Sequence, residues 1–136
     1  MKANELMIGD WVCYSESNNY YTKVEEIRCT SDGEEYYIRC HRDSKDTFLE
    51  QLKYEDFSVD ILHPIPLTPK ILENNGWEER PTGYVFYTDG RRYDNSLWYV
   101  FGSNSFVVNT AEFHIKYVHQ LQHALRLCRI EKEIEL

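Results

Sequence analysis

The sequence predicts an α+β fold of short antiparallel strands, with one short helix after the midpoint and a longer helix near the end. Aromatic residues make up 15% of the 136 residues. Many alternate with polar residues, as in strands with one buried face. Three prolines fall within residues 63–69, where they prevent a continuous helix or a central strand. Apolar residues over 117–129 recur at helical spacing. We therefore expect a small β subdomain over 1–66, and a second part over 67–136 that packs as one unit.

The first part is expected to form either a hairpin sheet or a small antiparallel β-barrel of the SH3-like kind. Residues 11–14 are predicted as a strand, and residues 20–29 and 35–41 as a hairpin around the dipeptide Asp32-Gly33. With those two residues as the loop, the opposed pairs are Cys29–Tyr36, Arg28–Tyr37, Ile27–Ile38, Glu26–Arg39 and Glu25–Cys40. This register gives one apolar and one polar face, and it keeps Cys29 away from Cys40.

The four cysteines include no C-x-x-C pair of the kind that starts a zinc or redox site. We expect four reduced thiols in a reducing cytoplasm, with Cys40 and Cys128 as small core residues. Residues 1–6 show no export signal. With a mean hydropathy of -0.61, no apolar run approaches the roughly 18 residues of a membrane span.

The second part begins with a short helix that several local signals predict together. Thr68 can cap it, Pro69 suits its first position, Leu67 and Leu72 can form a hydrophobic staple, and Gly76 can end it. Residues 77–108 then alternate aromatic and polar side chains, which indicates an antiparallel meander.

A last strand near residues 113–117 is expected to run into a helix over 117–129. On a helical wheel, an apolar stripe gathers Tyr117, Val118, Leu121, Ala124, Leu125 and Cys128. The opposite, polar face gathers His119, Gln122, His123 and Arg126. We expect this polar face to be solvated or to face a partner, and the acidic tail over 131–136 to fray or pack lightly.

Three stretches of the chain resemble a known group of proteins. They are MKANELMIGDWV at 1–12, IPLTPKIL through Gly76 at 65–76, and KYVHQLQ at 116–122. Together they are similar to short uncharacterised proteins of bacterial prophages and mobile elements. That resemblance implies a shared architecture and carries over no catalytic or binding residue. Separately, Gly9-Asp10-Trp11-Val12 resembles the Gly-Asp-x-Val entry strand of SH3-like small barrels, which implies a barrel in the first part.

His119 and His123 lie one helical turn apart, a spacing that lets two imidazoles bind one zinc ion. A metal-dependent hydrolase would also need a general base after the first histidine, and Gln120 cannot accept a proton there. Glu112 or His114 could supply a third ligand. Cys40 and His41 are neighbours on a strand and point to opposite faces, so they do not form a nucleophile pair. Without a nucleotide or hydrolase motif, we predict no enzyme and no cofactor.

Nucleic-acid binding is the other alternative. Arg91 and Arg92 beside the turn at 89–90, together with Trp98 and Tyr99, interleave guanidinium and aromatic groups as single-strand binding surfaces do. Residues 1–67, however, carry 7 basic and 14 acidic residues, a net charge of -7, which disfavours phosphate contacts.

We therefore predict a non-enzymatic module that binds another protein, with the oligomeric state left open and no membrane contact. The acidic first half could present a negative surface to a basic partner. The candidate binding residues are Arg91, Arg92, Trp98, Tyr99, His119, His123 and Arg126.

Overall fold

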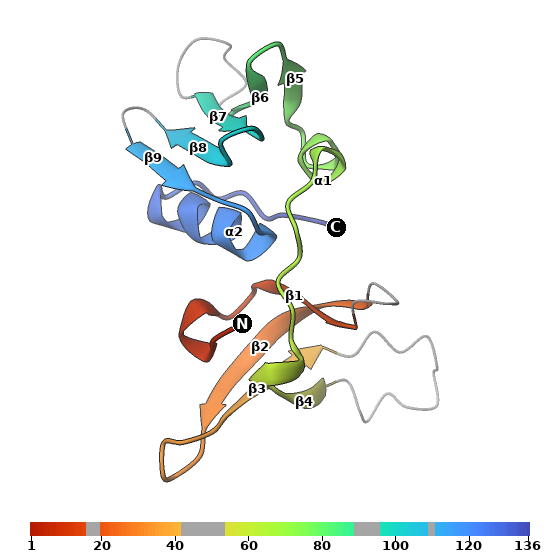
Figure 1. The fold of residues 1–136 in the computed structure, drawn as a ribbon, viewed down its shortest axis with the longest axis vertical. Helices are drawn as coiled ribbons and strands as arrows, with labels where there is room; N and C mark the ends of the chain where they lie inside the picture. Colours follow the sequence, from red (N-terminus) through yellow and green to blue (C-terminus); the bar gives the residue numbers. More distant parts are fainter. Residues whose placement is uncertain (16–19, 42–53, 89–95, 109–110) are drawn as a thin grey trace. The chain divides into compact units, whose positions relative to one another are not determined.

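The computed structural model describes residues 1–15, 20–41, 54–88, 96–108 and 111–136. The chain divides into two compact units, Met1–Ile65 and Pro66–Leu136, each of which contains one antiparallel sheet (Figure 1). The α+β class is confirmed, with a meander and a C-terminal helix in the second unit. No helix within the described ranges is long and apolar enough to cross a membrane.

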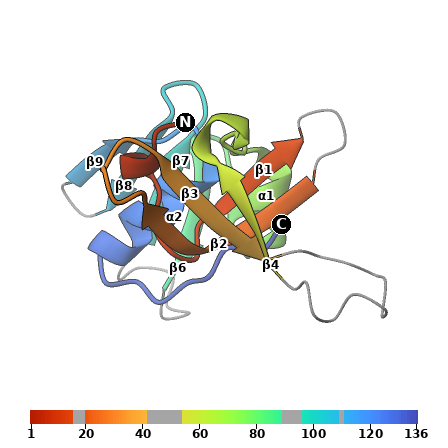
Figure 2. The same cartoon turned by 90° about the horizontal axis from the view of Figure 1, so that it is seen from below.

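The first unit is built on a sheet in the order β1-β2-β3-β4, whose strands run side by side in Figure 2. Its elements are η1 (Ala3–Glu5), β1 (Trp11–Ser15), β2 (Tyr20–Cys29), β3 (Tyr36–His41), β4 (Tyr54–Ser58) and η3 (Val59–Ile61). After η3 the chain returns to β1 through an isolated bridge between Cys13 and His63. In the described part of the unit the sheet does not close, so of the two expected forms it is the hairpin sheet.

The predicted register of β2 and β3 is right at four pairs and wrong at the fifth. Glu26–Arg39, Ile27–Ile38, Arg28–Tyr37 and Cys29–Tyr36 are opposed as expected. Cys40, however, lies opposite Val24 and not Glu25, because a β-bulge intervenes between Val24 and Glu26. The bulge buries Val24 and leaves the Glu25 carboxylate exposed, which avoids burying a charge in the core.

The hairpin loop is longer than the predicted two residues. The Thr30 N–H donates to the Glu35 carbonyl at 2.9 Å, and the Gly33 N–H donates to the Thr30 carbonyl at 2.9 Å. The pairing therefore ends at Thr30 and Glu35, and a turn lies between them. Cys29, predicted on the apolar face, is exposed because it sits beside this turn and beyond the core.

Cys29 is not part of the core of the first unit. That core gathers the buried side chains Leu6, Val12, Val24, Ile38, Cys40, Phe57 and Leu62. Cys40 is fully buried, as expected for a small core residue, whereas Cys128 of the second unit is only half-buried.

The second unit is a five-stranded meander with a helix before it and a helix after it. Its elements are α1 (Pro69–Asn74), β5 (Glu78–Arg80), β6 (Gly83–Tyr87), β7 (Ser96–Val100), β8 (Ser105–Val108), β9 (Ala111–His114) and α2 (Val118–Leu127). Thr68 caps α1 as predicted, since its hydroxyl accepts a hydrogen bond from the Ile71 N–H at 3.3 Å.

The predicted solvated face of α2 is wrong at His119 and Gln122, which are both buried. His119 is covered locally, because the Tyr117 ring stacks on it at 5.9 Å and the His123 ring meets it edge-on at 5.7 Å. Burial on α2 thus extends well beyond the apolar stripe.

Of the two expectations for the acidic tail, fraying or light packing, fraying is wrong, because the tail packs against its own unit. Ile134 is buried, and the backbone of Glu135 exchanges two hydrogen bonds with the side-chain amide of Asn75. The buried Ile134 and the matching Asn75 amide outweigh the surrounding charges and fix the tail to the end of α1.

Candidate functional site

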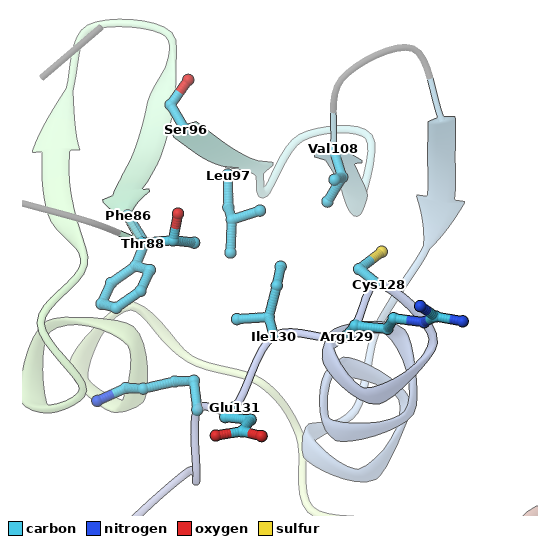
Figure 3. A pocket seen from close by; sticks show the side chains of 10 residues that line it. Phe86, Thr88, Ser96, Leu97, Val108, Cys128, Arg129, Ile130 and Glu131 are labelled. Carbon is cyan, nitrogen blue, oxygen red and sulfur yellow. The ribbon is translucent and has the colours of Figure 1, made fainter. Parts of the chain in front are cut away.

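A pocket of 520 Å³ lies where α2 ends in the second unit (Figure 3). We call it the α2-end pocket. Strands β6, β7 and β8 and the segment after α2 supply its lining, which consists of Phe86, Thr88, Ser96, Leu97, Val108, Cys128, Arg129, Ile130, Glu131 and Lys132. Its volume falls in the range of small-molecule sites.

The segment after α2 is shaped by a Schellman motif. The Ile130 N–H donates to the Leu125 carbonyl at 2.9 Å, and the Arg129 N–H donates to the Arg126 carbonyl at 3.0 Å. Arg129 therefore adopts a left-handed backbone with φ 57°, which glycine usually occupies. The turn directs Ile130 toward Leu97, inside the pocket (Figure 3).

The same segment is fixed again farther along the chain. The Asn75 side chain donates to the Glu135 carbonyl at 2.7 Å and accepts from the Glu135 N–H at 2.8 Å. Because Ile134 is buried beside this contact, the wall from Cys128 to Lys132 is held at both of its ends.

Two cations border the pocket. The Lys132 ammonium lies over the Phe86 ring, 5.5 Å from its centroid, and the Arg129 side chain extends outward from the end of α2 (Figure 3). In the part of the chain that the structure describes, neither cation forms an ion pair. The Thr88 and Ser96 hydroxyls lie on the strand side, and Glu131 supplies the single carboxylate.

A second concave site lies in the first unit and has the opposite charge. We call this 420 Å³ hollow the acidic groove; its lining residues are Glu34, Glu35, Tyr36, Tyr37, Ser58, Val59 and Asp60. The hairpin of β2 and β3 brings one side, and the end of β4 with η3 brings the other. Tyr36 and Tyr37 are exposed at 43% and 40%.

Hydrogen bonds order the groove. The Tyr37 hydroxyl donates to Glu35 Oε2 at 2.9 Å, and this bond to a carboxylate raises the pKa of Tyr37 above its usual value. At the tip of the hairpin the Thr30 hydroxyl donates to Asp32, which lowers the pKa of that carboxyl. Three of the residues that line the groove are acidic and none of them is basic.

The nearby arginines are already engaged with other carboxylates. Arg39 binds Asp56 at 2.9 Å and Glu26 at 3.3 Å, and Arg28 binds Glu26 at 2.9 Å. A hydrogen bond from Arg28 lowers the pKa of Glu26, and one from Arg39 lowers the pKa of Asp56. Within the described residues, Glu34, Glu35 and Asp60 have no ion-pair partner.

The histidine pair of α2 does not gather a metal site. His119 and His123 touch edge-on, but among the described residues no group of three His, Cys, Asp or Glu side chains is placed to hold an ion. Neither Glu112 nor His114 completes the pair. Arg126, in the last turn of α2, is exposed and does not line the α2-end pocket.

Trp98 and Tyr99, predicted to form one aromatic binding surface, lie on opposite faces of β7. Tyr99 is buried, and its hydroxyl donates to the Ile115 carbonyl at 2.6 Å, so its expected exposure on a binding surface is wrong. Trp98, on the opposite face of β7, is half-buried and donates to the Ser96 hydroxyl at 3.2 Å. Adjacent strand residues point to opposite faces, so the two rings cannot act together. Arg91 and Arg92 lie outside the described residues.

Comparison of the chain with protein-family models, curated proteins and solved structures finds no match. The support for the candidate sites therefore comes from their geometry alone. Sequence reasoning missed both. The juxtaposition of Glu34-Glu35 with Tyr36-Tyr37 was a visible signal for the groove, but Asp60 arrives through a strand that was not predicted. Nothing in the sequence pairs Arg129 with Phe86 or Leu97.

Proposed function

We propose that this protein is a non-enzymatic protein-binding module of the kind carried by phages and mobile elements, and that its acidic groove receives a basic segment of another protein. The observation that carries the proposal is the grouping in one hollow of three carboxylates, which form no ion pair within the described residues, with Tyr37, whose hydroxyl donates to one of them. The resemblance of three stretches to prophage proteins supports the origin.

The chemistry of the groove suits lysine and arginine side chains. Carboxylates form charge-assisted hydrogen bonds with guanidinium and ammonium groups, and tyrosine faces attract the same cations. Tyrosine is enriched at the centres of protein interfaces, whereas glutamate and aspartate are depleted there. A surface that combines tyrosines with carboxylates is expected to select a basic partner over an apolar partner.

The wider charge of the first unit acts in the same direction. Its net charge of -7, counted over residues 1–67, would steer a basic partner toward the unit and raise its association rate at low salt. The same charge repels nucleic acid, whose affinity depends on cationic contacts to phosphate.

The test is a titration of the whole protein with a short peptide that alternates arginine and glycine, against the same peptide with citrulline in place of arginine. We expect saturable binding of the arginine peptide only. The triple variant Glu34→Gln/Glu35→Gln/Asp60→Asn should bind about tenfold more weakly, because each exposed ion pair contributes up to about 1 kcal/mol.

Two controls separate a specific groove from general attraction. Glu25→Gln removes one exposed charge from the same unit, outside the groove, and should leave the affinity nearly unchanged. Tyr36→Ala/Tyr37→Ala should weaken binding at high salt as well, because it removes contact area rather than charge. Equal binding of both peptides, or a triple variant with parental affinity, would rule out the groove as the interface.

A further inference from the structure

We propose that the α2-end pocket binds a small organic monoanion, an apolar body that carries one carboxylate. This inference concerns the second unit and does not depend on the acidic groove of the first. It rests on the apolar side chains that point into the pocket, on two cations without an ion pair in the described part of the chain, and on a residue that keeps a costly backbone conformation at the rim.

The interior of the pocket suits an apolar body. Leu97 and Ile130 point toward each other across it, with Phe86 and Val108 on either side (Figure 3). Burial of an aryl or alkyl group against such walls is favourable by about 25 cal/mol for each Å² of apolar surface removed from water.

The charges that border the pocket favour one negative group. Arg129 and Lys132 supply two positive charges, and Glu131 supplies one negative charge whose carboxylate points away from Leu97 (Figure 3). The net lining charge of +1 matches a monoanion better than a dianionic phosphate ester. Because the Arg129 side chain extends outward from the end of α2 (Figure 3), a carboxylate that projects beyond the rim could accept a two-pronged hydrogen bond from the guanidinium, the geometry that arginine favours.

The backbone at Arg129 is a second, independent pointer. A left-handed conformation costs a residue with a Cβ roughly 1 kcal/mol or more, a cost that glycine would avoid. Residues held in such conformations concentrate at ligand sites, where the side chain justifies the strain. Here the side chain that glycine would lack is a cation at the edge of a pocket.

The pocket is also preformed. The Schellman motif fixes its wall at one end, and the pairing of Asn75 with Glu135 fixes it at the other. A ligand therefore loses little affinity to ordering the site.

The experiment uses 4-phenylbutanoate as the probe and its uncharged amide, 4-phenylbutanamide, as the matched control. Binding to the full chain is followed by calorimetry and by alkylation of the thiols, read by mass spectrometry. Cys128 lines the pocket, whereas Cys29 is an exposed cysteine of the other unit and serves as the internal reference. We expect the acid to slow alkylation of Cys128 and not of Cys29.

The role of the cation is tested by Arg129→Gln, with Arg126→Gln as its control. Both remove a charge at the end of α2, but only Arg129 lines the pocket. We expect the acid to bind the parent about tenfold more tightly than the amide does, equivalent to about 1.4 kcal/mol. Arg129→Gln should remove this preference without changing the amide, and Arg126→Gln should preserve it.

Three results would overturn the proposal. They are unchanged alkylation of Cys128 at saturating acid, equal affinity for acid and amide, and a preference that survives Arg129→Gln. Tighter binding of 4-phenylbutyl phosphate than of the acid would refute the assignment to carboxylates. A melting curve of each variant confirms that a lost preference does not reflect unfolding.

Discussion

The two helices of the second unit end in the same hydrogen-bond pattern but with different residues at its critical position. After α1, Trp77 and Gly76 donate to Leu72 and Glu73, each at 3.0 Å. After α2, Ile130 and Arg129 donate to Leu125 and Arg126, at 2.9 and 3.0 Å. The left-handed residue is Gly76 in the first case, with φ 84°, and Arg129 in the second, with φ 57°.

The difference shows two uses of one turn. At α1 the turn serves the fold, because glycine adopts its backbone without strain and the following Trp77 is buried. At α2 the turn carries an exposed cation to a pocket, at a cost that the fold alone does not require. One hydrogen-bond pattern thus occurs both at a position that serves stability and at a position that we infer to serve binding.

The largest expected effects come from the buried leucines that anchor the two helices. Leu72 and Leu121 are each 0% exposed, so Leu72→Ala and Leu121→Ala should each lower the free energy of unfolding by about 2 to 5 kcal/mol. Denaturant unfolding measures both. Leu127→Ala is the control on α2, because that side chain is 75% exposed and should change stability by less than about 0.5 kcal/mol. A small loss for only one leucine would show that the helices are not equally anchored.

A smaller loss of stability is expected at the contact between the end of α1 and the C-terminal tail. Asn75→Ala should cost about 1 to 3 kcal/mol, because the buried Asn75 side chain loses two part-buried hydrogen bonds to the backbone of Glu135. The exposed neighbour Asn74→Ala provides the matched control. Hydrogen exchange at the Glu135 amide should accelerate in the first variant only. Unchanged exchange would mean that Ile134 alone holds the tail.

Local signals in the sequence predicted most of the elements but not the buried polar contacts between them. The cap at Thr68 and the stop at Gly76 depend on residues within one turn, and α1 forms as they indicate. The register of β2 and β3 was predictable up to the bulge, where burial of Val24 overrides simple alternation.

The misplaced elements and residues depend on tertiary and side-chain contacts. Burial of His119 follows from ring contacts with Tyr117 and His123 that a helical wheel does not represent. Docking of the tail depends on Asn75, which lies 60 positions from Glu135. Strand β4 (54–58) was missed because its apolar content is low, and pairing with β3 stabilises it. Contacts distant in sequence decide the tail and β4, whereas side-chain contacts between neighbouring residues of one helix decide the burial of His119.

The role of the left-handed glycine after α1 is tested by Gly76→Ala. A Cβ at this position would meet Phe86 Cε2 at 3.5 Å, an ordinary contact, so the cost should come from the backbone. We expect a loss of about 1 to 2 kcal/mol, and a larger loss for the β-branched Gly76→Val. Thermal or denaturant unfolding measures both variants. Parental stability in Gly76→Ala would contradict the role assigned to this turn in the fold.

The smallest expected effect has the opposite sign. Arg129→Gly relieves the left-handed conformation, and the exposed side chain that it removes has no ion-pair partner in the described part of the chain. The variant should therefore gain up to about 1 kcal/mol of stability. Arg129→Ala is the control, because alanine also removes the cation but keeps the backbone strain, and it should leave stability within about 0.5 kcal/mol of the parent.

Because both variants lack the guanidinium, both should lose the preference for 4-phenylbutanoate over its amide. A stabilised Arg129→Gly protein without that preference would show that the strained arginine serves the ligand and not the fold. A destabilised one would show that the arginine supports the helix end, and the contrast with Gly76 would then have to be explained by packing.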